Sequence, residues 1–289
     1  MSLRRQYTMS AAAGRSLKTA RQPWVGYAPT AVTTSVSSLV NVSATSPNTK
    51  TAWTQLFSAA QNTSDTGMML LYTPLTIYAG NNGALYDIGI GASGSETVIA
   101  SNIGCGGYEA NGSQPAILLP VFIPSGTRVA YRGQVAASGS QTLYAVAFLM
   151  RTDFMEVLPR SLDVIGTSTA TSRATALSGA SGTYTQITGA TSRAYQSVIL
   201  YPSAGSKTGI SANFRLTLAI GPPGSEVDLC SCEANQQGGG TFAVSNSFCS
   251  IVSLPAGRYI PAGSRLSVKH NIAANPDRVE CCVIGVPYG

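Results

Sequence analysis

Residues 123–132 read IPSGTRVAYR, and residues 260–269 read IPAGSRLSVK. In both segments proline sets φ for a tight turn and glycine takes the strained turn position. The residues that follow alternate apolar with polar side chains, at the period of a half-buried strand. The same turn and strand therefore occur twice in this chain. The repeated turn comprises Pro124, Gly126, Arg128, Pro261, Gly263 and Arg265.

Two further matches extend this repeat toward the N-terminus. WTQL at residues 53–56 returns as YTQI at residues 184–187, and DIGIGASGSE at residues 87–96 returns as TLAIGPPGSE at residues 217–226. Three matches in the same order, at nearly constant spacing, are typical of a tandem repeat.

We therefore predict two homologous domains. The repeat places them at residues 31–152 and 161–289, joined by a linker at residues 153–160. Within each domain, short alternating segments are separated by turns rich in Gly, Asn and Pro, and no long segment has the apolar period of a helix. Roughly eight short strands per domain predict an all-β fold of two tandem β-sandwich domains, jelly-roll-like.

An extended arm at residues 1–30 is predicted to precede them. Six basic residues come before the first acid, Asp65, and the rest of the chain is formally neutral, so the net charge of +6 lies at the N-terminal end. We expect the arm to dock on neighbouring subunits; the alternatives are contact with nucleic-acid phosphates, a transit peptide and an arm without a partner. Its basic residues are Arg4, Arg5, Arg15, Lys18 and Arg21.

Composition excludes several classes of protein. Charged residues make up 10% of the chain, against roughly a quarter in ordinary soluble domains. No segment approaches the roughly 18 apolar residues of a membrane helix, so no membrane partner is expected. A low-charge surface suits an extracellular or virion protein, or a face covered by other subunits.

The cysteines leave three alternatives open. They could form one or two disulfides in the second domain, remain buried thiols, or bind a soft metal. The C-x₂-C spacing of structural zinc sites is missing, so no metal site is predicted. Candidates for disulfides are Cys230, Cys232, Cys249, Cys281 and Cys282, and the sequence does not decide their pairing.

Candidate catalytic residues are few. Glu226 and Asp228, on one side of a predicted strand, are the best pair of acids for glycoside chemistry, but solvated turn charges are the preferred interpretation. The single histidine, His270, is expected at the surface, and no G-x-S-x-G elbow accompanies it. No phosphate loop is present either. We therefore assign no catalytic, cofactor-binding or metal-binding residue.

Two surface features have alternative interpretations. Arg128 and Arg265 are expected at equivalent surface positions, either as outward basic residues or as a repeated contact with a partner. The tyrosines near loops are expected to pack in cores or interfaces, whereas the alternative is stacking on sugar rings. These tyrosines are Tyr108, Tyr195, Tyr201, Tyr259 and Tyr288.

With its repeat, its Ile-Pro-x-Gly-x-Arg turns and its Ser/Thr/Gly/Ala-rich strands, the chain resembles structural proteins of tailed-bacteriophage virions, such as head decorations, collars, spikes and fibre bases. The resemblance implies a non-enzymatic virion protein that docks through its basic arm. It also implies no cofactor, and as partners other virion proteins and copies of itself in a trimer or ring.

Two other functions remain as hypotheses. One is a glycan-binding adhesin or receptor-binding fibre protein, with a host-surface glycan bound near Tyr108 and residues 236–240. The other is an enzyme such as a polysaccharide depolymerase acting through Glu226 or Asp228. Nucleic acid is not an expected partner.

Overall fold

The structure is a computed structural model that describes residues 32–37, 40–73, 84–105, 116–136, 141–151, 158–204, 212–236, 251–254, 259–272 and 279–288. Every regular element in these segments is a β-strand, and the strands pair antiparallel. The predicted all-β fold class is therefore confirmed. The predicted arm at residues 1–30 lies outside the described residues, as do most residues of the predicted linker.

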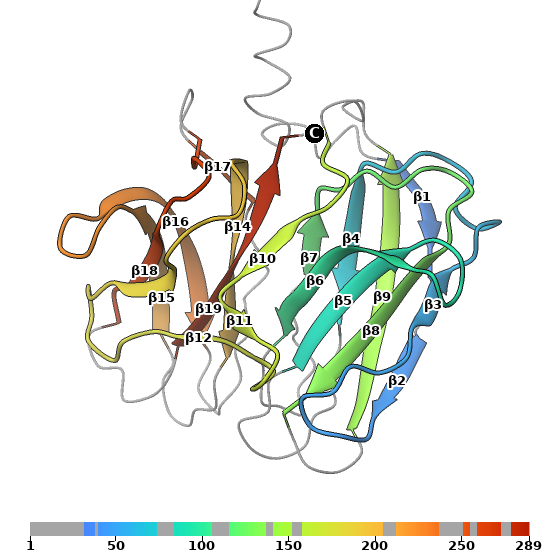
Figure 1. Cartoon of the computed structure of the whole chain (residues 1–289), viewed down its shortest axis with the longest axis horizontal. Helices are drawn as coiled ribbons and strands as arrows, with labels where there is room; N and C mark the ends of the chain where they lie inside the picture. Colours follow the sequence, from blue (N-terminus) through green and yellow to red (C-terminus); the bar gives the residue numbers. More distant parts are fainter. Residues whose placement is uncertain are drawn as a thin grey trace, which may run out of the picture.

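The strands before residue 152 form two sheets, coloured blue to green in Figure 1. A five-stranded sheet has the order β1-β9-β4-β7, with β2 also paired to β9. Its strands are β1 (Val32–Val36), β2 (Val40–Ala44), β4 (Met68–Tyr72), β7 (Ala116–Leu119) and β9 (Gln141–Arg151). The opposing sheet has the order β3-β8-β5-β6. Its strands are β3 (Thr54–Phe57), β5 (Ala84–Ile90), β6 (Thr97–Cys105) and β8 (Val129–Val135).

The strands after residue 162 repeat this arrangement, coloured yellow to red in Figure 1. A six-stranded sheet has the order β11-β12-β19-β14-β17, with β10 also paired to β19. Its strands are β10 (Asp163–Ile165), β11 (Thr167–Ser168), β12 (Arg173–Ala176), β14 (Tyr195–Ala204), β17 (Ile251–Ser253) and β19 (Val279–Pro287). The opposing sheet has the order β13-β18-β15-β16. Its strands are β13 (Thr185–Thr188), β15 (Ala212–Ile220), β16 (Val227–Gln236) and β18 (Leu266–His270).

Both halves have the strand order of a jelly roll. The interrupted segments β1–β2 and β10–β12 each take the place of one strand. Numbered in this way, the strands of each half follow the order 1-8-3-6 in one sheet and 2-7-4-5 in the other, which is the jelly-roll arrangement. The repeated turn precedes the seventh strand each time, and its glycines have positive φ, 69° at Gly126 and 79° at Gly263. Glycine adopts this left-handed conformation without the steric cost that a Cβ atom adds.

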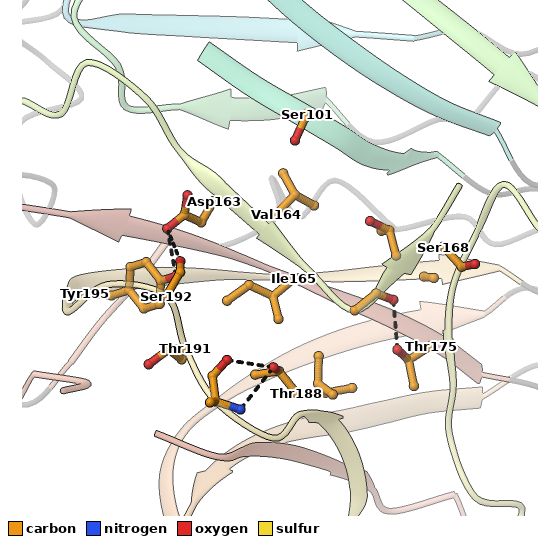
Figure 2. A pocket seen from close by; sticks show the side chains of 15 residues that line it. Ser101, Asp163, Val164, Ile165, Ser168, Thr175, Thr188, Thr191, Ser192 and Tyr195 are labelled. Atoms are coloured by element: carbon orange, nitrogen blue, oxygen red, sulfur yellow. Dashed lines mark hydrogen bonds between the residues drawn. The ribbon is translucent and has the colours of Figure 1, made fainter. Parts of the chain in front are cut away.

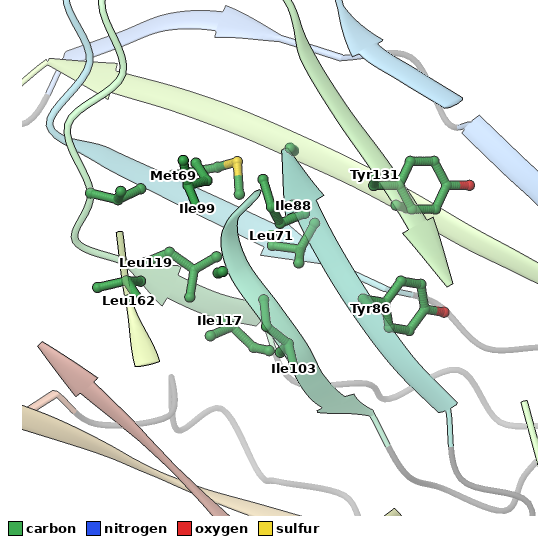
Figure 3. Close-up of a cluster of buried hydrophobic side chains, with 14 of the residues drawn as sticks. Met69, Leu71, Tyr86, Ile88, Ile99, Ile103, Ile117, Leu119, Tyr131 and Leu162 are labelled. Atoms are coloured by element: carbon green, nitrogen blue, oxygen red, sulfur yellow. The ribbon is translucent and has the colours of Figure 1, made fainter. Parts of the chain in front are cut away.

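The first core fills the space between the sheets of the first half (Figure 3). Along β8, Val129 and Tyr131 point into this core, and Gly133 leaves room for Leu143, whose Cδ1 would lie 2.4 Å from an added Cβ. Tyr131 donates its hydroxyl proton to the carbonyl oxygens of Val40, at 3.0 Å, or Leu143, at 3.2 Å. A second core fills the sandwich of the second half.

The two halves pack against each other through β6. The strands β10, β11, β12, β14 and β19 all contact β6, and the halves lie side by side in Figure 1. Leu162 donates its backbone N–H to the carbonyl oxygen of Ile99 at 2.7 Å, and Gln134 Nε2 donates to the carbonyl of Thr169 at 2.6 Å. The first core therefore continues into the second half, where it includes Ile199, Tyr201, Cys282, Ile284 and Val286.

Candidate ligand-binding pocket

A pocket of about 510 Å³ lies where the second half meets β6. The segment from Asp163 to Ser168 forms one wall, β12 and the end of β13 form another, and Ser101 reaches it from β6. Figure 2 shows Ser101 across the pocket from Thr188 and Thr191. This volume is in the range of about 300–1,000 Å³ that is usual for sites of small molecules.

Hydroxyl groups dominate the described lining of this pocket. Eight of the fifteen residues carry one, and the apolar floor comes from side chains such as Val164, Ile165 and Ile187. The residues with hydroxyls are Ser101, Thr167, Ser168, Thr175, Thr188, Thr191, Ser192 and Tyr195. Such a surface offers donors and acceptors together with a patch for C–H groups.

Asp163 is the one charged side chain among the described lining residues, and its charge is matched next to the pocket. Arg193 binds it through Nη2 to Oδ1 at 2.6 Å and through Nε to Oδ2 at 2.9 Å. Oδ2 also accepts from the Tyr195 hydroxyl at 2.8 Å and from Ser192 Oγ at 3.2 Å. This Asp163 cluster fixes the orientation of the Tyr195 and Ser192 hydroxyls in the lining of the pocket and leaves no net charge there.

Burial and hydrogen bonding act in opposite directions on Asp163. Burial favours the neutral acid, but the hydrogen bonds from Arg193 and Tyr195 outweigh it and hold the pKa of Asp163 below its usual value. Burial, together with the bond to Asp163, raises the pKa of Tyr195 to about 12. At neutral pH Asp163 is therefore a carboxylate and Tyr195 a hydroxyl donor.

This lowered pKa predicts how stability depends on pH. A carboxyl group whose pKa is lower in the folded state stabilises the fold above its unfolded pKa of about 3.9, and this contribution is lost as the pH falls through the folded pKa. We expect Asp163→Asn to unfold at a lower temperature than the unaltered protein at pH 6, with the gap closing toward pH 2. Thermal unfolding of both proteins across this range measures it; a gap that is constant with pH would contradict the assignment.

Three hydroxyls are available to a ligand. In the part of the chain that the structure describes, the side chains of Ser101, Thr167 and Ser168 form no hydrogen bond, whereas Thr175 donates to the carbonyl of Gly166 at 2.8 Å. Thr188 and Thr191 are likewise engaged with backbone groups of Ala190 and Pro261. A ligand in the pocket could therefore bind Ser101, Thr167 and Ser168 without breaking bonds of the fold.

The repeated turns carry a different constellation. Arg128 Nη1 lies 2.6 Å from Glu96 Oε1, and Arg128 Nε donates to Gln55 Oε1 at 3.2 Å. The second half has the same contacts at the equivalent positions: Arg265 Nη1 lies 3.0 Å from Glu226 Oε1, and Arg265 Nε donates to Gln186 at 2.9 Å. Both arginines occupy equivalent positions, next to the core-facing Val129 and Leu266, and most of each side chain is covered by its ion pair.

The predicted pair of acids does not line this pocket. Glu226 is engaged with Arg265, and its second oxygen accepts the N–H of Gly224 at 2.8 Å. Asp228 binds Lys269 Nζ at 2.9 Å and accepts from the Tyr184 hydroxyl. Neither residue lies among the described lining of the pocket, so the structure does not bring them to a shared substrate site.

His270 differs from its prediction. It is 1% exposed, not at the surface, because β18 ends beneath the segment from Ser178 to Gly182. Its Nε2 lies 2.6 Å from the carbonyl oxygen of Ser178, and Nδ1 accepts the N–H of Ile272 at 3.2 Å. With Nδ1 as the acceptor from Ile272, Nε2 is placed to donate to Ser178. His270 therefore satisfies backbone groups of the fold.

Four of the five candidate cysteines are free thiols. Cys230 and Cys232 point to the same side of β16, toward the second core, and Cys281 and Cys282 are buried in β19. Burial raises the pKa of Cys230 and of Cys232 to about 12, so both remain protonated. No disulfide joins two of these four residues. Cys249 lies outside the described residues.

The other predicted sites lie mostly outside the described part of the chain. This holds for Arg4, Arg5, Arg15, Lys18 and Arg21 of the arm, for Tyr108 and for residues 237–240. Tyr195 and Tyr201 are buried, whereas Tyr259 and Tyr288 are about half exposed. Among the described residues no cluster of three His, Cys, Asp or Glu side chains could hold a metal ion. The described segments also contain no helix able to cross a membrane.

Comparisons with known proteins give a limited result. No family model and no curated protein matches this chain. Among solved structures it is similar to PNGase F, a glycosylasparaginase from Flavobacterium meningosepticum, at 12% identity over 86% of this chain and 96% of that chain, with a TM-score of 0.31. A second similar structure is a peptide-N(4)-(N-acetyl-β-D-glucosaminyl) asparagine amidase, at 10% identity over the same shares, with a TM-score of 0.30.

These findings contradict the predicted function. The matched structures are amidases and not virion proteins, so the prediction of a non-enzymatic bacteriophage structural protein is wrong by this comparison. The prediction rested on composition and on turns that report a β-sandwich, and one fold serves many unrelated functions. The likeness is too weak to transfer an activity or substrate to this chain.

Sequence reasoning missed the pocket. In the sequence, nothing separates Tyr195 from the other tyrosines near loops, and Asp163 and Ser192 belong to no recognisable motif. The three lie within 32 residues in the chain, but they meet only because β10 and β14 both pair with β19. A stretch dense in Ser and Thr, from residue 167 to 192, was the one local hint.

Proposed function

We propose that this protein binds a neutral, hydroxyl-rich molecule, a saccharide, in the pocket at the Asp163 cluster. The observation that carries the proposal is the convergence of hydroxyls on a cavity whose one described charge is cancelled by Arg193. A saccharide presents groups that both donate and accept, and Ser, Thr and Tyr hydroxyls match them in either sense.

Because the Asp163 cluster has no net charge, it favours a ligand without charge. An anionic ligand would approach a carboxylate, and a cationic ligand would have to compete with Arg193, whose Nη2 and Nε already bind Asp163 at 2.6 and 2.9 Å. The aliphatic side chains of Ile165 and Ile187 can pack on the C–H groups of a sugar ring. Neutral sugars are therefore favoured over sugar acids and sugar phosphates.

Three variants test the proposal. Ser101→Ala and Ser168→Ala each remove a hydroxyl that makes no bond within the described fold, so each should weaken binding about 2- to 10-fold, the usual worth of one hydrogen bond. Ala190→Trp places a large ring at the pocket from an exposed position and should abolish binding. Ser95→Ala, an exposed serine in the first half, is the matched control and should leave affinity unchanged.

Titration calorimetry of the whole chain against a panel of neutral mono- and oligosaccharides, with glucuronate and inorganic phosphate for comparison, provides the readout. Saturable binding of a neutral sugar, lost in Ala190→Trp, supports the proposal. Binding of the charged probes alone, binding that Ala190→Trp leaves intact, or no binding of any sugar would overturn it.

A further inference from the structure

An apolar surface remains on the outside of the first half. In β4, β7 and β9, alternate side chains point into the first core, and the others point outward from the five-stranded sheet. The outward Met68 is buried, and six further outward residues are apolar and half-buried. We call the set the outer apolar face; it consists of Leu70, Leu118, Tyr144, Val146, Phe148 and Met150.

No charge interrupts this face. Among the described residues of the sheet that point outward, the rim carries Asn41, Ser43 and Thr142, which are polar but uncharged. In the described part of the chain, β4, β7 and β9 make their main contacts with strands of their own sandwich. An apolar centre with an uncharged polar rim is the composition of a protein–protein interface.

In the second half, the face equivalent to the outer apolar face is covered. Phe148 pairs with Leu70 in the first half as Ile284 pairs with Ile199 in the second, so the two pairs occupy the same positions. Ile199 and Ile284 are both 0% exposed. They belong to the first core, because the first half covers them through β6.

A head-to-tail arrangement of copies cannot cover the outer apolar face in the same way. Within the chain the covering surface includes Gly104, whose added Cβ would lie 3.4 Å from Cys282 Sγ. The position equivalent to Gly104 in the second half is Glu233, which is paired with Arg215 at 2.7 Å and is exposed. Burying this charged pair on an apolar face would be costly. The same face of another copy carries no charge in its described outward residues, so it does fit an uncharged apolar face.

We infer that the outer apolar face docks a second copy of this chain, face to face about a two-fold axis. In such an interface each residue meets a symmetry-related position of the same surface, so an uncharged sheet is complementary to itself. Two sheets packed in this way lie about 10 Å apart. The β16 side, with Arg215 and Glu233, stays in solvent.

The mass of the whole chain in solution tests the inference. Light scattering over a range of concentrations should give twice 29.8 kDa for the unaltered protein. Phe148→Arg, at the centre of the face, and Tyr144→Arg, near its rim, should both give 29.8 kDa. The matched control Ser231→Arg, on exposed β16, should keep the doubled mass.

Circular dichroism and thermal unfolding establish that each variant is folded. If Phe148→Arg does not fold, Tyr144→Arg alone decides. A monomeric unaltered protein at all concentrations, a trimer or larger ring, or a dimer that survives both arginine variants overturns the inference. A dimer that dissociates in Ser231→Arg also overturns the inference. The same holds for a dimer that is lost when residues 1–30 are deleted but persists in Phe148→Arg and Tyr144→Arg.

Discussion

Asp87→Asn is expected to lower the free energy of unfolding by about 3–5 kcal/mol, because it removes the shared partner of two cations on the outer side of β5. Lys50 Nζ lies 2.8 Å from Oδ1, and Arg132 Nε lies 2.8 Å from Oδ2. The backbone N–H of Asn102 also donates to Oδ1 at 2.7 Å, where the pairing of β5 with β6 is irregular. The Asp87 side chain is 3% exposed, so water cannot replace it.

The loss of stability in Asp87→Asn should depend on pH, and this dependence would identify the unpaired Lys50 ammonium as a cause. Burial lowers the pKa of Lys50, and Asp87 opposes that shift. Without Asp87 the ammonium is buried unpaired, so the pKa of Lys50 falls further below its unfolded value. A base whose pKa is lower in the folded state reduces the free energy of unfolding at a pH where the base is charged in the unfolded chain. This reduction becomes smaller as the pH rises toward the unfolded pKa of about 10.4. The deficit of Asp87→Asn should therefore narrow between pH 7 and pH 10.

Asp228→Asn is the matched control. Lys269 lies 4.4 Å from the centroid of the Tyr184 ring, as Arg132 lies 4.5 Å from that of Trp53, and Asp228 pairs with this lysine. The Asp228 side chain, however, is 51% exposed, so the variant should cost no more than about 1 kcal/mol. Urea unfolding of both variants gives the comparison. Equal losses, or a deficit of Asp87→Asn that does not change with pH, would refute the argument from burial.

Asp87 and Asp228 show where the correspondence between the two sequence repeats ends. The aligned segments pair Trp53 with Tyr184 and Arg132 with Lys269, and each aromatic does meet its cation. The same alignment pairs Asp87 with Thr217, which suggests that the acid is missing from the second half. Asp228 replaces it from the neighbouring strand β16. A position-by-position comparison does not show this exchange, because the repeat aligns Asp228 with Val98 and not with Asp87.

The fold was more predictable than the pocket for a related reason. Alternation and turn chemistry are local, so short strands and the positive φ of Gly126 and Gly263 follow from the sequence. The burial of His270 does not follow from the sequence, because Ser178, whose carbonyl meets its ring, lies 92 residues away in the chain. The pocket forms because β10 and β14 both pair with β19. The spacing of residues in the sequence does not predict this pairing.

Gly285→Ala is expected to lower the free energy of unfolding by about 1–3 kcal/mol, because it overpacks the wall behind the pocket. A Cβ on Gly285 would lie 2.5, 2.7 and 2.8 Å from three carbons of the Tyr195 ring. The ring is 0% exposed, and its hydroxyl is tied to Asp163 at 2.8 Å, so it cannot move aside freely. Asp163 itself pairs with Gly285 across β10 and β19.

Gly189→Ala is the matched control with the opposite expected sign. At Gly189 the nearest atom to an added Cβ is Nε2 of the Gln186 side chain, at 3.5 Å, which is ordinary contact. Because alanine restricts the unfolded chain more than glycine does, this variant should raise stability by about 0.4–1 kcal/mol. Gly285→Ala should also weaken saccharide binding, since a displaced Tyr195 disturbs the Asp163 cluster. If Gly285→Ala is as stable as the unaltered protein, Tyr195 is not the rigid wall inferred here.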